Sequence, residues 1–425
     1  MPDTEATSPS IPADLKRYID ANEGALLEIA TSLVEIDSQN PPGRTVQAIT
    51  YLEDRFDDLG ITTNRVSTDT EKPNLIATIE GETDTTIAFN GHVDTVPFER
   101  ERWEFNPLGE RVDDRLYGRG ATDMKGAIAS MLQMASAFIE TDTIPPHSLQ
   151  FVIVSDEETA GAAGLPSVLE GGHIEADACV IGEPTCEEGL HSVTVADKGS
   201  IWLTLEATGI AAHGSRPQYG ENAIEHLLHA VDEIRKSLEA IEFNLDPVIE
   251  EIIDESAAFY SNRLDQSEAR ALFTKPTVNL GTIEGGETVN RVPDRASAQL
   301  DIRLTAGVHT PAILSTIREL IAPMDRVSIG EVSWSLGTYE SIDAPIVSAV
   351  AQSAADVAGE RIYRRSATGG GDAKQLREYG ISTVEFAFST DTAHAVDEYT
   401  TREILQRNAM TYATIPYAYP TADDP

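Results

Sequence analysis

Histidines and acidic residues recur in this chain where apolar segments of the sequence end. They are His92, Asp94, Asp123, Asp156, Glu157, Glu158, Glu183 and His394. Imidazole nitrogen and carboxylate oxygen together bind hard to borderline divalent metals, and such a set needs no thiolate. Two ions about 3.5 to 4 Å apart, bridged by a carboxylate and a water, form the usual two-metal hydrolase arrangement. The residue types therefore predict a divalent-metal site with room for two ions.

Each of these residues also has a plainer interpretation. His92 and Asp94 could belong to an ordinary turn at a strand end, and Asp123 follows a glycine-rich loop and could cap the helix that begins there. Asp94 could also hold a ligating imidazole in one tautomer without touching the metal. His394, with Glu398 close behind it, could be structural. The repetition of acids at successive strand ends favours the ligand interpretation.

The run from Asp156 to Glu158 concentrates charge at the end of an apolar strand. Adjacent carboxylates repel each other there unless a cation or a shifted proton lies nearby. Neighbouring side chains on extended backbone point in opposite directions, so one of Glu157 and Glu158 can bind a metal while the other exchanges a proton with water.

The elements that must hold these residues alternate between helix and strand. Helices are predicted over 14–37, 45–59 and 125–138, and a short glycine-rich helix precedes strand 178–181. Strands are predicted over 74–79, 86–90 and 149–155, the first two as neighbours. This alternation indicates an α/β fold whose central sheet is mostly parallel, flanked by helices. Ligands bind at the carboxyl ends of strands in such sheets.

The pattern changes at about residue 196 and returns at about 338. Between them the order is strand 200–208, helix 222–241, strands 277–283 and 296–304, and helix 310–321, which indicates an inserted α+β domain of the ferredoxin-like kind. An acidic helical excursion occupies 243–275. Helices 344–358 and 372–379 and strand 383–388 then complete the outer domain. We therefore expect a discontinuous catalytic domain, 1–195 and 338–425, and a lid or dimerisation domain, 196–337.

Composition excludes several classes of function. The 425 residues include 71 Asp plus Glu against 31 Lys plus Arg, a formal charge of -40. Nucleic acids and anionic membranes would repel such a protein, so we expect neither as a partner. The charge fits a halophilic surface in molar salt, where the Debye length is about 3 Å, or an ordinary acidic cytosolic protein. Cys179 and Cys186 cannot form a disulfide framework, and residues 1–20 lack a leader pattern, so we expect a cytoplasmic location.

Six motifs in order resemble one family of hydrolases. They are Gly91-His92-Val93-Asp94-Thr95-Val96-Pro97, Gly118-Arg119-Gly120-Ala121-Thr122-Asp123-Met124-Lys125-Gly126, Asp156-Glu157-Glu158, Gly182-Glu183-Pro184-Thr185, Ala212-His213-Gly214-Ser215 and Ala393-His394. The chain resembles, over nearly its whole length, the co-catalytic zinc family of acetylornithine deacetylase, succinyl-diaminopimelate desuccinylase, aminoacylase and bacterial glutamate carboxypeptidase.

The resemblance implies roles for the metal-site residues. His92, Asp123 and Glu183 would hold one metal, and Asp123, Glu158 and His394 the other, so that Asp123 bridges two divalent ions, zinc or alternatively cobalt or manganese. Glu157 would be the general base that takes a proton from water and returns it to the leaving amine. Asp94 would orient His92.

The resemblance also implies roles for residues outside the metal site. His213 of the lid domain would stabilise the oxyanion, often in the partner subunit of a homodimer formed through that domain. Asn290 and Arg303 would contact a substrate carboxylate, which suits the paired donors of a guanidinium. Gly369, Gly370 and Gly371 would form a substrate loop in which ligands approach backbone N–H groups. This loop lacks the serine of the desuccinylase form, and the 243–275 excursion is longer than in compact relatives.

These features lead to three functional hypotheses. The first is metal-dependent hydrolysis of the amide bond in an N-acyl amino acid, of the acetylornithine deacetylase or succinyl-diaminopimelate desuccinylase type. The second is a dipeptidase or carboxypeptidase acting on a small peptide by the same chemistry. The third is an acidic metal-binding protein without catalysis. The presence of the full site set argues against it, namely His92, Asp123, Glu157, Glu158, Glu183 and His394.

Overall fold

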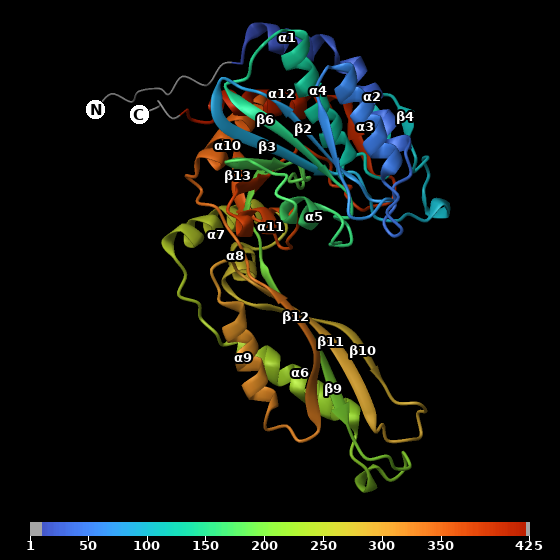
Figure 1. Cartoon of the computed structure of the whole chain (residues 1–425). Helices are drawn as coiled ribbons and strands as arrows, with labels where there is room; N and C mark the ends of the chain where they lie inside the picture. Colours follow the sequence, from blue (N-terminus) through green and yellow to red (C-terminus); the bar gives the residue numbers. More distant parts are fainter. Residues whose placement is uncertain (1–10, 422–425) are drawn as a thin grey trace, which may run out of the picture. The chain divides into compact units, whose positions relative to one another are not determined.

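A computed structural model describes residues 11–421 of the chain, which form two compact units (Figure 1). Residues 1–10 of the stretch searched for a leader lie outside this range. Of the described residues, the first unit comprises 11–195, Glu340–Arg364 and 371–421, and the second comprises Ala196–Tyr339 and Arg365–Gly370. In the described part of the chain, no helix is long and apolar enough to cross a membrane.

An eight-stranded sheet forms the centre of the first unit. Its strands, in spatial order, are β1 (Thr63–Val66), β2 (Asn74–Ile79), β6 (His147–Val154), β3 (Thr83–His92), β7 (Ala178–Ile181), β14 (Ser382–Glu385), β8 (His191–Ala196) and β13 (Ile362–Ser366). The pairs β3/β6, β3/β7 and β7/β14 are parallel, while β1/β2, β2/β6 and β8/β14 are antiparallel. Every residue of β6 and β7 is buried, as expected for strands covered on both faces.

Helices cover both faces of this sheet (Figure 1). They are α1 (Ala13–Ala21), α2 (Glu23–Glu35), α3 (Val46–Asp58), α4 (Lys125–Glu140), α5 (Leu165–Glu170), α10 (Pro345–Ala358), α11 (Asp372–Tyr379) and α12 (Arg402–Ala418). On one face, Phe89 and Phe151 of the sheet contact Phe56 of α3 and Tyr412 of α12. On the other, apolar residues of α5 and α11 close a second core. A small sheet of β4 (Glu110–Val112), β5 (Arg115–Tyr117) and β15 (Tyr399–Thr401) joins segments far apart in sequence.

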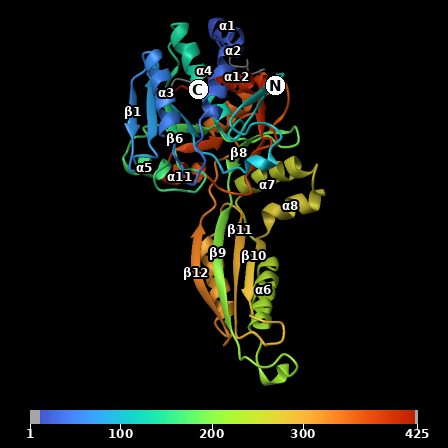
Figure 2. The ribbon, with the colours of Figure 1, turned by 90° about the vertical axis from the view of Figure 1, so that its right-hand side faces the viewer.

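The second unit is built on a four-stranded antiparallel sheet (Figure 2). Its strands, in spatial order, are β10 (Thr277–Gly285), β11 (Arg295–Leu304), β9 (Gly199–Thr208) and β12 (Val327–Ser335). Residues of β9 alternate between buried and more exposed, and the buried ones pack against α6 (Ala223–Glu239) and α9 (Thr310–Ile321). This strand order and βαββαβ connection are those of the ferredoxin-like domain that the sequence predicted, with β12 as a final strand that was not predicted.

The acidic excursion folds as two helices, α7 (Pro247–Tyr260) and α8 (Gln266–Thr274). Asp246 caps α7 ahead of Pro247, and Asp265 with Glu268 forms a capping box on α8, so local sequence specifies both starts. Ile249, Ile253 and Phe273 form a small core between the two helices.

The predicted α/β class with a mostly parallel sheet is confirmed, but two predictions of detail are wrong. Strands 74–79 and 86–90 are not neighbours, because β6 lies between β2 and β3 and pairs with both. The helix predicted over 14–37 is interrupted at Asn22, whose side chain donates to the Tyr18 carbonyl and ends α1.

Candidate metal centre

Most of the predicted metal-site residues of the first unit lie at the carboxyl ends of neighbouring parallel strands. His92 is the last residue of β3, and Asp94 follows it by two positions. Glu157 and Glu158 follow β6, and Glu183 follows β7. Because β6, β3 and β7 are adjacent and parallel, three segments far apart in sequence meet at one sheet edge.

Asp123 stands between the two histidines. Its Oδ1 lies 3.3 Å from His92 Nε2, and its Oδ2 lies 3.1 Å from His394 Nε2. Glu183 Oε1 is 3.3 Å from His92 Nε2, and Glu158 Oε2 is 3.3 Å from His394 Nε2. Each histidine thus faces one oxygen of Asp123 and one glutamate, which is the arrangement that a bridging aspartate between two ions requires.

The donor set fits divalent cations. The ligand atoms of His92, Asp123 and Glu158, and those of His92, Glu157 and Glu183, lie within 4.8 Å of one another. Asp123 Oδ1 is buried and accepts no hydrogen bond from the described residues. A buried carboxylate oxygen without a donor is costly unless a cation meets it. Asp123 also does not cap α4, which begins at Lys125 after Met124 with no side-chain cap.

Mutual contacts shift the titration of the site. Hydrogen bonds to Asp123 and Glu158 raise the pKa of His394 to about 10. Burial opposes charge on His92, but contacts with Asp123, Asp94 and Glu183 raise its pKa well above the ordinary value. Burial and the charge of Asp123 raise the pKa of Glu183. Protons would therefore balance these carboxylates wherever dications do not.

Glu157 differs from Glu158 in its contacts. Glu158 faces His394 with Oε2, and its Oε1 accepts from the Val96 backbone at 3.2 Å. Burial raises the pKa of Glu157 to about 7. A carboxylate that titrates near neutrality can take up and release a proton, so this glutamate suits the role of general base. The choice between the two glutamates, which the sequence left open, therefore favours Glu157 as the base.

Asp94 supports the site through backbone contacts. His92 Nδ1 lies 2.9 Å from the Asp94 backbone carbonyl and 3.6 Å from its carboxylate, so the carbonyl is the nearer partner of the imidazole. The Asp94 carboxylate instead accepts the backbone N–H groups of Glu157 and Glu158, at 3.2 Å each.

Arg119 lies inside one of the six motifs, although no role was predicted for it. Glu398 Oε2 accepts from Arg119 Nη1 at 2.6 Å, and its Oε1 accepts the backbone N–H groups of Gly120, Thr122 and Asp123 at 2.9 to 3.1 Å. Arg119 also donates to the His394 carbonyl at 3.2 Å. This buried pair ties the Asp123 loop to the His394 loop. The signal in the sequence that could have identified Arg119 is a charged residue placed between two glycines, Gly118 and Gly120.

His213 and Asn290 lie together in the second unit. The Gly214 N–H donates to the Asn290 carbonyl at 2.6 Å, and a side chain at Gly214 would collide with the Asn290 backbone. His213 Nδ1 accepts from the Ser215 N–H at 3.2 Å, so a neutral ring carries its proton on Nε2. His213 is exposed and can donate that proton. The structure thus places the backbone segment of His213, predicted to stabilise the oxyanion, next to that of Asn290, predicted to bind the substrate.

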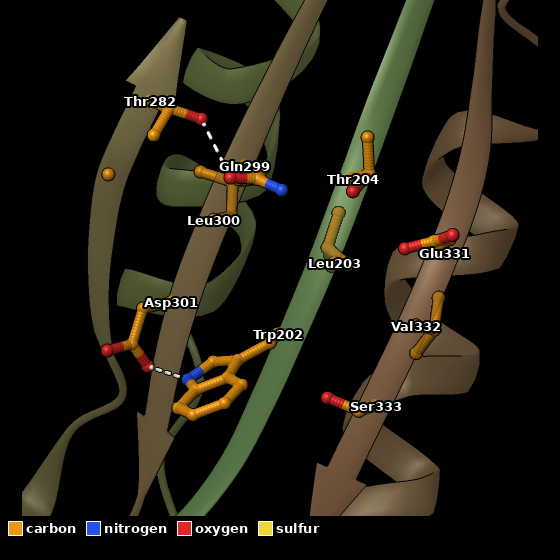
Figure 3. Close-up of a pocket in the computed structure, with 11 residues that line it drawn as sticks. Trp202, Leu203, Thr204, Thr282, Gln299, Leu300, Asp301, Glu331, Val332 and Ser333 are labelled. Carbon is orange, nitrogen blue, oxygen red and sulfur yellow. Dashed lines mark hydrogen bonds between the residues drawn. The ribbon is translucent and has the colours of Figure 1, made fainter. Parts of the chain in front are cut away.

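Arg303 lies on the sheet of the second unit, beside a groove of about 710 Å³ that Trp202 and Asp301 help to line (Figure 3). Asp301 accepts from Arg303 at 2.7 and 3.1 Å and from the Trp202 indole at 2.9 Å. The Arg303 guanidinium carbon lies 5.6 Å from the Trp202 ring centre. Its Nε and Nη2 face Asp301, so Nη1 lies outside this pair.

The glycine run divides between the units at its last residue. Gly369 and Gly370 belong to the second unit, and Gly371 belongs to the first. A side chain at Gly371 would begin 3.2 Å from Glu157 Oε1, whereas nothing lies within 4 Å of one at Gly369. Gly371 therefore borders the candidate base, and Gly369 leaves open space.

Comparison with known proteins gives matches over most of the chain. The sequence profile of peptidase family M20/M25/M40 matches residues 88–417. A succinyl-diaminopimelate desuccinylase of Methylocella silvestris is 29% identical over 348 residues, covering 78% of this chain and 82% of that protein. An acetylornithine deacetylase of Pasteurella multocida is 31% identical over 272 residues, covering 62% of each chain.

Two solved structures share the fold. An M20 family metallo-carboxypeptidase from Sulfolobus solfataricus aligns with a TM-score of 0.76 at 19% identity, covering 92% of this chain and 99% of that one. A dinuclear metal-binding M20 peptidase from Bacillus subtilis aligns with a TM-score of 0.65 at 16% identity, covering 94% and 98%.

Proposed function

Since the chain belongs to peptidase family M20/M25/M40 and is a hydrolase of amide or peptide bonds, we propose that it hydrolyses the amide bond of an N-acyl amino acid. The observation that carries this proposal is Asp123 between His92 and His394, with Glu157 beside them. The names of the desuccinylase and deacetylase relatives support an acylated amino acid as the substrate.

His92, Asp123 and Glu183 would hold one divalent ion, and Asp123, Glu158 and His394 the other. Bound dications would lower the pKa of water and polarise the amide carbonyl. We propose zinc as the native metal, with cobalt or manganese as alternatives, because imidazole and carboxylate ligands accept all three.

The chain's own residues would move the protons. Glu157, with its pKa near neutrality, would take a proton from water and return it to the leaving amine. His213 Nε2–H would donate to the developing oxyanion. Arg303 and Asn290 would bind the free carboxylate of the substrate, with Arg303 Nη1 available for it, and the backbone of the glycine loop 369–371 would border the bound substrate.

A peptidase function is the second candidate. The metallo-carboxypeptidase fold neighbour favours it, because a free carboxylate next to the scissile amide is also what a carboxypeptidase or dipeptidase recognises. The two candidates differ only in the group on the acyl side of that bond.

A substrate panel separates these candidates. The stripped protein is reloaded with Zn²⁺, Co²⁺ or Mn²⁺ and assayed on N-acetylornithine, N-succinyl-diaminopimelate, dipeptides and longer peptides. We expect cleavage of an N-acyl amino acid. Preferential cleavage of peptides supports the second candidate. If the protein binds two metal ions but cleaves no substrate, both candidate functions are contradicted, and a metal-binding protein without catalysis remains.

The Glu157→Gln variant tests the base. We expect its kcat to fall by about 10²- to 10⁴-fold, because general base catalysis supplies about that factor, with metal content unchanged. Glu170→Gln, at an exposed position on α5, is the matched control and should keep full activity. An active Glu157→Gln enzyme would refute the assignment.

We also propose a cytoplasmic, halophilic homodimer formed through the lid domain. The charge of -40 supports the salt requirement, and neither of the two buried cysteines forms a disulfide. Sedimentation tests the homodimer. Activity measured between salt-free buffer and roughly 1 M KCl, where the Debye length is near 3 Å, tests the salt requirement. Stable activity without salt would contradict the halophilic proposal.

A further inference from the structure

A lysine and an asparagine lie behind the candidate metal centre, in the first unit. Asn40 is in the loop between α2 and α3, and Lys72 is in the loop between β1 and β2. Asn40 Nδ2 donates to Asp94 Oδ2 at 2.8 Å and to Asp156 Oδ1 at 2.9 Å. Asn40 Oδ1 accepts from Lys72 Nζ at 3.4 Å, and Lys72 also forms an ion pair with Asp156. One amide thus joins two carboxylates to one ammonium.

Asp94 and Asp156 position the backbone of Glu157 and Glu158. Asp156 immediately precedes Glu157, and it adopts a positive φ of 69°. Asp94 accepts the backbone N–H groups of both Glu157 and Glu158. A displacement of Asp94 or Asp156 would therefore move the candidate base and a candidate metal ligand together.

The surrounding sequence leaves space for this network. A side chain at Gly43 would lie 2.7 Å from Lys72 Cε and 2.8 Å from Asn40 Oδ1, at a φ of +76°. One at Gly161 would lie 1.8 Å from Asp156 Oδ2. Both contacts are too short for any real Cβ, so glycine is required at both positions for Asn40, Lys72 and Asp156 to lie where they do.

Charge explains why both donors are needed. Asn40, Asp94 and Asp156 are each buried, at 2%, 0% and 5% exposure, and two carboxylates that share one amide repel each other. The Lys72 ammonium forms an ion pair with Asp156 and so offsets part of this repulsion.

We propose that Asn40 and Lys72 are positioning residues for this hydrolase, which fix Glu157 and Glu158 through Asp94 and Asp156. Asn40 supplies the two N–H donors, and Lys72 supplies an ammonium that pairs with Asp156 and contacts the Asn40 oxygen. The inference rests on the proposed function, because it takes Glu157 as the base and Glu158 as a metal ligand. Neither Asn40 nor Lys72 touches the reacting atoms.

The variants Asn40→Asp and Lys72→Met test this inference. Asn40→Asp keeps the side-chain shape but replaces the donors with a third carboxylate. We expect kcat to fall by about 10- to 100-fold, as for residues that orient metal ligands, with KM changed less than threefold. The kcat of Lys72→Met should also fall, and Lys72→Arg should keep most of the activity because it keeps the charge.

A metal-binding measurement gives a readout independent of turnover. Co²⁺ affinity is determined by competition with a chelator for the wild type and each variant. We expect Asn40→Asp to weaken one of two Co²⁺ sites by about 10- to 100-fold, since Glu158 loses its fixed backbone. The exposed residues Asn64 and Lys16 provide matched controls, Asn64→Asp and Lys16→Met, which should change neither kcat nor affinity.

The outcomes separate this inference from the proposed function. Wild-type kcat and Co²⁺ affinity in Asn40→Asp and Lys72→Met would overturn the inference. Equal loss in Lys72→Arg and Lys72→Met would also overturn it, because charge would then not matter. If the wild type cleaves no amide, the proposed function fails, and the Co²⁺ arm still decides whether Asn40 fixes Glu158. If Asn40→Asp fails to fold, the Lys72 variants decide.

Discussion

Replacing Glu398 with glutamine should destabilise the first unit more than any surface change of the same kind. Glu398 is fully buried and accepts four hydrogen bonds, one from the Arg119 guanidinium and three from backbone N–H groups of the Asp123 loop. Glutamine keeps one oxygen. Its NH₂ group must therefore face either Arg119 or the three backbone donors, and the charge that balances Arg119 is lost.

The magnitude follows from burial of the pair. Arg119 is 5% exposed and Glu398 0% exposed. Removing one partner of a buried ion pair leaves an uncompensated charge, which costs about 3–5 kcal/mol. The exposed pair Arg407–Glu403 on α12 has the same separation of 2.6 Å, so Glu403→Gln is a matched control. Glu403 is 68% exposed, so Glu403→Gln should lower the free energy of unfolding by less than about 1 kcal/mol.

Fluorescence of Trp103 can report on the first unit alone. The chain has three tryptophans, and Trp202 and Trp334 lie in the second unit. With these two changed to phenylalanine, only Trp103 remains, and Arg119 lies over its ring at 5.3 Å. Urea titration of the metal-stripped protein then gives the free energy of unfolding of this unit, free of the mixed transitions that two compact units would produce.

The reasoning is refuted if Glu398→Gln lowers the free energy of unfolding by as little as Glu403→Gln does. A double-mutant cycle with Arg119→Met adds a second check. If the two residues act as one pair, the double variant should lose clearly less than the sum of the single losses. Additive losses would show that Glu398 acts through the backbone donors alone.

Three further predictions concern protons and space. Metal binding near pH 8 should release protons, one of them from His394, because contacts with Asp123 and Glu158 raise its pKa to about 10; calorimetry in buffers of different ionisation enthalpy measures this, and a heat independent of buffer would contradict it. For the same reason the contribution of His394 to the stability of the metal-free protein should be complete below pH 6.5, the ordinary pKa, and disappear as the pH rises through about 10, its pKa in the folded chain; denaturant titrations across this range check the sign. Gly161→Ala should lower activity by about 10- to 100-fold by displacing Asp156, whereas Gly24→Ala on α2, where nothing lies within 4 Å, should leave activity unchanged.

The parts of the fold that local sequence specifies were predictable. Helix α9 and strands β2 and β7 match their predicted ranges, because periodicity and flanking turn residues fix them. The pairing of β6 between β2 and β3 was not predictable, since strand order depends on contacts between distant segments. Helix α12 was missed because buried polar residues such as Asn408 and Thr411, together with Pro416, interrupt its apolar pattern.

The same division holds for the candidate site. Acids at strand ends are visible in sequence, and parallel strands bring His92, Glu158 and Glu183 to one edge. The supports of these residues are not visible, because Asn40 reaches Asp94 and Asp156 across 54 and 116 positions of sequence. Only the geometry shows which polar residue serves which carboxylate.

The division of the chain into units determines how the second unit could be isolated as a recombinant fragment. The backbone passes between the units at 195/196, 339/340, 364/365 and 370/371. A fragment cut at 196 and 339 would lack 365–370, from which the Ala367 N–H donates to the Ala196 carbonyl at 2.7 Å and the Ser366 N–H donates to Ser256 Oγ at 2.9 Å. It would also lose Arg365, which lies 4.6 Å above the Phe259 ring. A soluble lid fragment therefore needs residues 365–370 rejoined by a short linker, and a single gene deletion cannot remove this unit cleanly.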